Sequence, residues 1–281
     1  MTQHEATVSI VMGCYNAEPE HLREALESAL SQTHPGVDVI VVNDGSTRSD
    51  TLEALAEYSS RVRIIHQENA GIAAARNTAV AASTADYIQI LDSDDILESN
   101  VVEQGASVLE DPAVEIVFSS AKVFGDRHED FTAGEEYKLS GIIETNRITI
   151  CTMVRRTSWN AVGGQWEEDR QIFEDYELWI RLLRDGGIAR RTPSARFHYR
   201  VRGNSLSTQL PAESMQRTRE VVLKANPNHH VQLLQAAFER LDEIQHEKFE
   251  FAQYVKKWQR RTLPLIKLRD QAAKVRSLML R

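Results

Sequence analysis

Val8-Ser9-Ile10-Val11-Met12 is the first of four short β-branched runs near the start of the chain. The others are Val37–Val42, Val62–His66 and Tyr87–Leu91. Between them, apolar residues recur at helical spacing around Leu22–Leu30, Ser49–Tyr58 and Gly71–Ala82. Strands that alternate with helices form βαβ units, and such units build a parallel sheet. The sequence therefore predicts an α/β fold with a mostly parallel central sheet flanked by helices.

Beyond Asp95 the alternation is less regular, although further elements are predicted. These are a helix from about Glu98 to Glu110, a strand at Val114–Ser119, a long surface loop at Phe124–Tyr137, a strand at Ile148–Arg155, a buried helix at Phe173–Arg184 and a β segment at Ile188–Tyr199. After Pro211 the composition shifts to Gln, Glu, Arg, Leu and Ala without a strand signal. We therefore expect one domain over residues 1–210 and a helical segment over 211–281.

Charge is distributed unevenly along the chain. Residues 254–281 hold nine basic side chains against one acidic side chain, so this tail carries +8 and the remainder −16. The negative sign of the body disfavours a nucleic-acid partner, whereas a basic terminal helix could meet anionic lipid headgroups. The apolar run Val8–Met12 is too short for a signal peptide or a membrane span, which makes the cytoplasm the expected compartment.

The sharpest local signal is Asp92-Ser93-Asp94-Asp95, which directly follows a predicted strand. Three carboxylates within four residues repel one another unless a cation lies between them or they face water. Mg²⁺ and Mn²⁺ take such oxygen ligands and commonly bridge a carboxylate to diphosphate oxygens. An acidic turn that caps the next helix through Asp94 or Asp95 is the other interpretation, and the motif by itself leaves both open.

Several motifs follow one another in a fixed order, each at the end of a predicted strand or the start of a predicted helix. They are Ser9–Met12 followed by Tyr15-Asn16, Val41–Ser46, Asn69–Asn77, Leu91–Asp95, Phe173–Leu178 and His198–Ser207. Together they resemble the family-2 glycosyltransferases of the Rossmann-like GT-A fold over roughly residues 7 to 205. The resemblance implies that residues 1–210 form a catalytic domain. Its expected reaction is an inverting transfer of a sugar from a nucleotide-sugar, with UDP the expected carrier, to a saccharide or lipid-linked acceptor.

The resemblance also implies roles for the strand ends. Tyr15 and Asp44 are expected to hold the base, by stacking and by accepting its N–H, and a carboxylate that accepts from a ring N–H discriminates bases more strongly than stacking does. Asp92 is expected at the ribose, and Asp94, with Asp92, at a Mn²⁺ or Mg²⁺ ion that grips the diphosphate. The other expected donor-binding residues are Asn16, Asn69, Arg76 and Ser93. From the residues alone, Tyr15 could instead pack at its strand end, and Asp44 could form an Asx turn.

Two later motifs complete the expected site. Glu174-Asp175 opens the predicted buried helix, where acids are also favourable for purely structural reasons. By resemblance, Asp175 is the general base that takes the proton of the acceptor hydroxyl, with Glu174 as the second choice. Arg202 and Ser205 are expected to bind the diphosphate, and His198 to be a further metal ligand, although this run could also simply face solvent.

The C-terminal segment allows two interpretations. A helical hairpin could pack on the catalytic domain or on a second copy in a homodimer, or residues 254–281 could contact the inner face of the cytoplasmic membrane from the periphery. Pro264 is expected to kink or interrupt the helix.

Two other functions remain as alternatives. A nucleotidyltransferase should have a Gly-rich phosphate loop after the first strand, which Gly13-Cys14-Tyr15-Asn16 does not supply. A catalytically silent nucleotide-binding or scaffold protein on the same fold is the second alternative. The sugar, the acceptor and the linkage stay open.

Overall fold

The computed structural model of the chain describes residues 6–131, 133–203 and 210–279, with the backbone alone for 129 and 259–279. Within these residues, ten strands form one sheet in the order β3-β2-β1-β4-β9-β6-β10-β5, with β7 paired to β6 and β8 paired to β10. The strands are β1 (Val8–Cys14), β2 (Val37–Asp44), β3 (Arg63–Gln67), β4 (Tyr87–Ile90), β5 (Ile96–Leu97), β6 (Val114–Gly125), β7 (Glu129–Phe131), β8 (Glu136–Tyr137), β9 (Thr152–Arg155) and β10 (Ile188–Val201).

The first four strands are mutually parallel, as the sequence predicts. In the second half β9 runs antiparallel to both β4 and β6, whereas β10 runs parallel to β6. The expected surface loop at Phe124–Tyr137 is wrong, because β6 continues to Gly125 and pairs with β7, and β8 pairs with β10. Strands β7 and β8 are only three and two residues long, and Asp130, Phe131 and Glu136 are exposed, so these strands lack the apolar alternation that sequence patterns detect.

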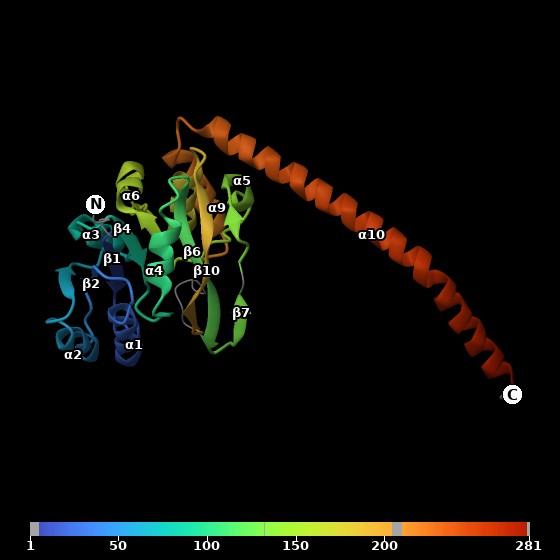
Figure 1. Cartoon of the computed structure of the whole chain (residues 1–281), viewed down its shortest axis with the longest axis horizontal. Coiled ribbons are helices and arrows are strands. Elements are labelled where there is room, and N and C mark those ends of the chain that lie inside the picture. Colours follow the sequence, from blue (N-terminus) through green and yellow to red (C-terminus); the bar gives the residue numbers. More distant parts are fainter. Residues whose placement is uncertain (1–5, 132, 204–209, 280–281) are drawn as a thin grey trace, which may run out of the picture.

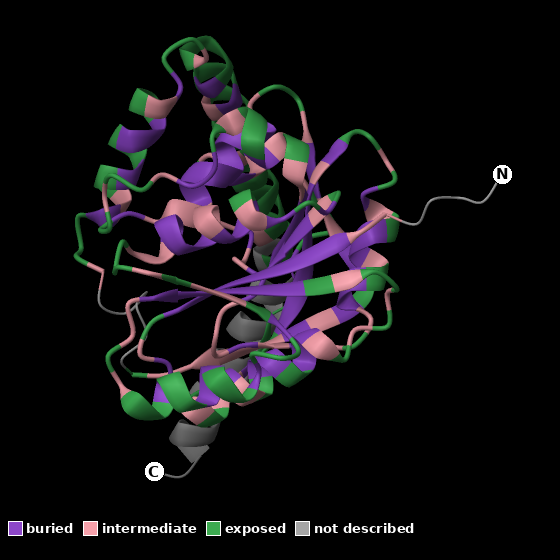
Figure 2. Cartoon of the chain, turned by 90° about the vertical axis from the view of Figure 1, so that its left-hand side faces the viewer, coloured by how far each residue is buried: buried purple, intermediate pink, exposed green. Residues whose placement is uncertain are grey.

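Helices cover both faces of the sheet (Figure 1). They are α1 (Pro19–Leu30), α2 (Ser49–Glu57), α3 (Ile72–Ala82), α4 (Val101–Val108), α5 (Leu139–Ile142), α6 (Arg156–Val162), α7 (Glu174–Leu183), α9 (Ser214–Ala225) and α10 (His230–Met279). The core on one face joins the sheet to α1, α2 and α4, and the core on the other joins it to α3, α6, α7 and α9. Figure 2 shows the buried residues in purple along the strands between these two layers.

The C-terminal segment is not a hairpin. Helix α9 packs against α7, and α10 begins beside α5 and then projects away from the body as one helix (Figure 1). Residues 230–279 contain no Gly or Asn that would favour a turn, and α10 continues through Pro264 without interruption. No helix in the described part of the chain is long and apolar enough to cross a membrane.

Candidate functional site

The motifs that follow the first, second and fourth strands meet at the carboxyl edge of the parallel strands. Strand β1 lies between β2 and β4, so Tyr15, Asp44 and Leu91–Asp95 emerge side by side from three neighbouring strands. In an open α/β sheet, this edge is where ligands bind. The side chain of Tyr15 is 54% exposed, which leaves its ring available for stacking rather than packed in the core.

Asp44 is buried and organises the loop that begins α3. Its carboxylate accepts hydrogen bonds from the backbone N–H of Ala70 and of Gly71, both at 2.8 Å, and from Nε2 of Gln67 at 2.7 Å. Nδ2 of Asn69 donates to the backbone oxygen of Asp44 at 3.0 Å. Asp44 and Asn69 therefore hold together the loops that follow β2 and β3.

Asn16, the residue after Tyr15, also uses its side chain to stabilise a loop. Its Oδ1 accepts from the backbone N–H of Thr47 at 2.8 Å and of Arg48 at 3.0 Å, and its own backbone has a positive φ of 47°. An Asn tolerates this conformation because its short polar side chain can bond locally. The contacts place Asn16 as a support for the turn that carries Tyr15.

Arg76 joins two motifs that are far apart in the sequence. Its buried guanidinium donates from Nη2 to Oδ1 of Asp92 at 2.6 Å and from Nη1 to Oε1 of Glu174 at 2.8 Å. Burial works to lower the pKa of Arg76, but the two carboxylates outweigh it and raise that pKa. The expected role of Arg76 is contact with the nucleotide, whereas in the structure it connects the acidic strand end to the start of α7.

The acidic motif holds carboxylates in three different settings. Asp94 is paired with Arg202, and burial together with the charge of Asp92 raises the pKa of Asp94. Asp95 is buried; its Oδ1 accepts the backbone N–H of Arg200 at 2.8 Å, while its Oδ2 has no partner among the described residues. Ser93 lies in the turn between Asp92 and Asp94. The motif leads into the short strand β5, so the helix-cap interpretation is wrong.

Asp175, at the start of α7, has a strongly perturbed environment. Neighbouring atoms enclose its carboxyl group, and burial followed by the negative charge of Glu174 raises the pKa of Asp175 from 3.8 to about 7. Oδ1 accepts the backbone N–H of Tyr176 at 2.7 Å, and Oδ2 accepts Nδ2 of Asn146 at 2.9 Å. The sequence does not single out Asn146, because it lies in an irregular segment without a recognisable motif.

Only part of the His198–Ser207 motif lies at the site. Arg202 reaches Asp94, but Nε2 of His198 lies 3.7 Å from Oε1 of Glu98, and its ring meets the edge of Phe124. Ser205 lies outside the described residues. No sequence motif points to His21 on α1; burial lowers the pKa of His21, and the nearby Arg200 and Arg202 act in the same direction.

A family model supports the interpretation of these motifs. Residues 9–163 match the model described as glycosyl transferase family 2. The chain belongs to this family. Its fold is accordingly a GT-A fold with a mostly parallel sheet.

Individual bacterial glycosyltransferases are similar to different parts of the chain. A glucosyltransferase of Escherichia coli, WfgD, is 28% identical over 186 residues, which cover 65% of this chain and 72% of WfgD. An uncharacterized glycosyltransferase of Rickettsia felis is 27% identical over 192 residues, covering 63% of this chain but only 31% of that protein. EpsH of Bacillus subtilis, a putative glycosyltransferase by name, is 36% identical over 121 residues, covering 42% of this chain and 35% of EpsH. The chain thus spans about a third of the length of the latter two relatives.

The solved structures of Staphylococcus aureus TarS have the same fold. Residues 1–349 of TarS in complex with UDP-GlcNAc superpose with a TM-score of 0.69 at 18% identity, covering 84% of this chain and 71% of that one.

The carboxylates of this family-2 chain fit a divalent cation. Among the described residues, no three His, Cys, Asp or Glu side chains converge to form a metal site made by protein alone. Mg²⁺, however, usually binds one or two carboxylates together with water and substrate phosphates. Asp92 and Asp94 offer such a pair, because they lie two positions apart where the chain leaves β4. These two residues would hold the ion, with the remaining positions left to the donor.

Proposed function

We propose that this chain transfers a sugar from a UDP-sugar to an acceptor hydroxyl with inversion at the anomeric carbon, in the synthesis of a cell-surface polysaccharide, glycolipid or glycoconjugate. The observation that carries the proposal is the enclosed carboxyl of Asp175, with a pKa of about 7, linked through Glu174 and Arg76 to Asp92 at the donor edge. The name of WfgD specifies UDP-Glc, and a TarS structure contains UDP-GlcNAc, which supports UDP as the carrier.

Asp175 is the proposed general base. Its carboxylate accepts the proton of the acceptor hydroxyl while the hydroxyl oxygen attacks the anomeric carbon on the face opposite the bond to UDP. A base works best when its pKa lies near the working pH, and such help typically contributes roughly 10²–10⁴-fold in rate. Asn146 holds the ionised carboxylate in position through its 2.9 Å hydrogen bond.

The donor is proposed to lie along the carboxyl edge of β1, β2 and β4. The exposed ring of Tyr15 stacks on the base, and Asp44 fixes the loop beside it. Arg202 binds the diphosphate, which competes with Asp94 for its guanidinium. A Mn²⁺ or Mg²⁺ ion at Asp92 and Asp94 would supply Lewis-acid stabilisation of the charge on the departing UDP.

Calorimetric titration with UDP tests the donor site. We expect Mn²⁺ to tighten UDP binding at least tenfold, about 1.4 kcal/mol, and Asp94→Asn to abolish that gain. Asp242→Asn, which removes an exposed carboxylate on α10, is the matched control. Turnover of a panel of UDP-sugars then identifies the donor. If no nucleoside diphosphate binds with or without metal, the scaffold alternative replaces the transferase.

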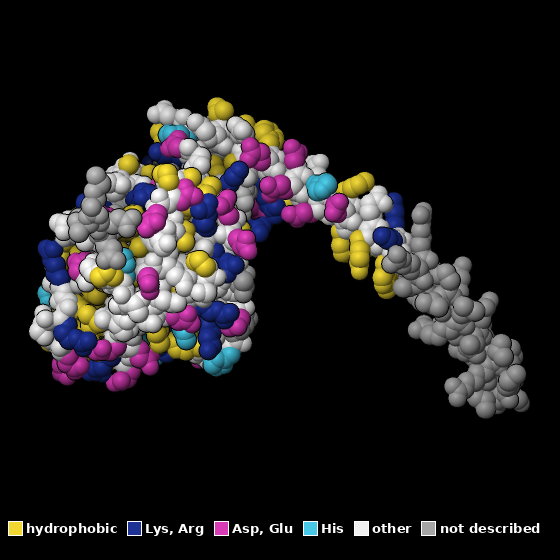
Figure 3. All heavy atoms as spheres, in the orientation of Figure 1, with side chains coloured by type: hydrophobic (Ala, Val, Ile, Leu, Met, Phe, Trp, Pro, Cys, Tyr) yellow, Lys and Arg dark blue, Asp and Glu magenta, His cyan; other side chains and the backbone are white. Residues whose placement is uncertain are grey.

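We further propose that α10 brings the enzyme to the inner face of an anionic membrane. Phe249, Phe251, Tyr254 and Trp258 are each more than half exposed, and Figure 3 shows hydrophobic side chains gathered on the outer half of the described surface of α10. The basic run of residues 254–281 begins at the same place. Aromatic side chains beside Lys and Arg on one helix are typical of helices that lie in a membrane interface.

A further inference from the structure

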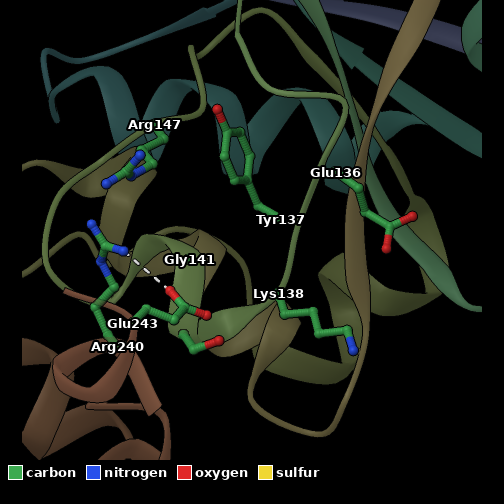
Figure 4. Close-up of a pocket in the computed structure, with 8 residues that line it drawn as sticks. Glu136, Tyr137, Lys138, Gly141, Arg147, Arg240 and Glu243 are labelled. Carbon is green, nitrogen blue, oxygen red and sulfur yellow. Dashed lines mark hydrogen bonds and ion pairs between the residues drawn. The ribbon is translucent and has the colours of Figure 1, made fainter. Parts of the chain in front are cut away.

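The cavity of about 360 Å³ beside α5, β8 and α10 is charged, but its charges are already paired. Figure 4 shows Arg147 and Arg240 turned toward one another at one end of it. Three carboxylates contact the guanidinium group of Arg240: Glu144 at 2.9 Å, Glu243 at 3.1 Å and Glu247 at 3.3 Å. Carboxylates therefore outnumber guanidinium groups there. A polar group that suits a ligand lies at the donor edge instead.

Gln67 is the last residue of β3 and lies directly beside Asp44. The two residues are paired in register at the ends of β3 and β2, and β2 in turn lies next to β1, which leads into Tyr15. Neighbouring strands are about 4.8 Å apart, so the end of β3 is two such spacings from the end of β1. A base that stacks on Tyr15 and extends toward β3 therefore comes within reach of the Gln67 side chain.

The polar groups around Gln67 are already bound within the chain. Asp44 is only 3% exposed, and its carboxylate accepts from Nε2 of Gln67 and from two backbone N–H groups just before α3. Asn69 uses both ends of its amide, because Oδ1 accepts Nη1 of Arg170 at 2.9 Å and Nδ2 donates to the backbone of Asp44 at 3.0 Å. A ligand thus meets little of Asp44 and an Asn69 amide whose two ends are occupied.

The amide of Gln67, by contrast, is only half used. A carboxylate accepts hydrogen bonds and donates none, so the 2.7 Å contact with Oδ1 of Asp44 comes from Nε2, and this contact fixes which end of the amide faces Asp44. Nε2 keeps a second N–H, and Oε1 accepts no hydrogen bond within the described part of the chain. The side chain is partly exposed. Gln67 therefore offers a ligand an oriented carbonyl acceptor beside an N–H donor.

An acceptor beside a donor complements the edge of uracil, in which N3–H lies between two carbonyl groups. Cytosine has an unprotonated nitrogen at the same ring position, so its lone pair would face the lone pairs of Oε1. A site built to accept a hydrogen bond rejects a ligand that cannot donate one, because the polar groups of the site are then left unpaired. The Gln67 amide therefore favours uracil over cytosine.

We propose that Gln67 determines the base specificity of the donor site, with Oε1 accepting N3–H of uracil and the remaining N–H of Nε2 donating to an adjacent carbonyl of the ring. This proposal rests on the proposed use of a UDP-sugar. It also changes the expected role of Asp44, since the buried carboxylate holds the Gln67 amide and the amide contacts the base.

Calorimetric titration of the full chain with UDP, CDP and N3-methyl-UDP, each with Mn²⁺, tests the proposal. In N3-methyl-UDP a methyl group replaces the proton that Oε1 accepts. We expect the native chain to bind UDP at least roughly tenfold more tightly than either analogue. Gln67→Leu should remove most of that preference, chiefly by weakening UDP. The control Glu68→Leu, which changes the exposed neighbouring side chain, should keep it.

The ratio of two Kd values measured on one preparation does not depend on how stable the variant is. If Gln67→Leu weakens UDP and CDP equally, the side chain only supports the loop, and the proposal is wrong. It is also wrong if Gln67→Leu discriminates as strongly as the native chain, because another group then accepts N3–H, or if the native chain binds UDP and CDP alike. A chain that binds none of the three nucleotides contradicts the proposed function itself, and the role of Gln67 falls with it.

Discussion

Replacing Asp175 with asparagine is expected to abolish turnover and, at alkaline pH, to stabilise the fold. The native state raises the pKa of this carboxyl from 3.8 to about 7, chiefly by burial and then by the charge of Glu174. Between pH 3.8 and pH 7, roughly, the Asp175 carboxyl keeps its proton in the folded chain but has lost it in the unfolded chain. The unfolded state therefore binds fewer protons, and the contribution of Asp175 to stability falls as the pH rises through this window.

The magnitude follows from the two pKa values of 3.8 and about 7. At pH 5 the Asp175 carboxyl of the native state is still protonated, whereas at pH 8 it has ionised in its buried position. From pH 5 to pH 8 the native protein should lose about 2.6 kcal/mol through this group, and Asp175→Asn should lose none of it. The hydrogen bond from Asn146 lowers the pKa of Asp175, and its effect is already contained in the value of about 7.

Urea denaturation of the two proteins at pH 5 and pH 8 measures the effect, with Asp242→Asn as the control. We expect the stability of Asp175→Asn relative to native to increase by about 2–3 kcal/mol between these pH values, and that of the control to stay constant. Turnover of the UDP-sugar should vanish in Asp175→Asn and, in the native enzyme, rise as the pH passes about 7. A pH-independent stability difference, or a variant that still turns over, would refute the reasoning.

Four further outcomes are expected. Asn146→Ala removes a hydrogen bond that lowers the pKa of Asp175, so the acidic limb of kcat/KM against pH should move to higher pH; an unchanged limb contradicts the role. Arg76→Met leaves two carboxylates without their shared partner and should cost about 3 kcal/mol in chemical denaturation, whereas a neutral effect would show that the pairing is dispensable. Tyr15→Ala should weaken UDP binding by about 1–3 kcal/mol, measured by calorimetry; unchanged affinity excludes stacking. Trp258→Glu should reduce sedimentation with anionic vesicles but not the UDP affinity; if it instead dissociates a dimer, α10 binds a second copy.

Several parts of the site are predictable because they depend on short-range patterns. The β-branched runs predict the parallel strands, and the carboxyl ends of parallel strands meet at one edge. That rule alone places Tyr15, Asp44 and Asp92 near one another. The order of the motifs then indicates the family, which the match over residues 9–163 confirms.

Other contacts could not be predicted, because they join residues far apart in the chain. Arg76 and Glu174 are separated by 98 positions, and Arg240 meets Glu144 across 96. Asn146 and Arg147 lie in an irregular segment, where side-chain direction is set by packing rather than by a helical or strand period. Sequence patterns therefore indicate Asp175 but not the asparagine that orients it.

The sequence by itself determined the fold class and which acidic groups lie at the carboxyl edge of the parallel strands, because each depends on local periodicity and strand direction. Only the tertiary structure decided the partners of those groups: that Arg76 connects Asp92 to Glu174, that burial raises the pKa of Asp175, and that Arg147 faces Arg240 across a cavity. Partners and pKa values depend on distance and burial in three dimensions, and one sequence does not specify either.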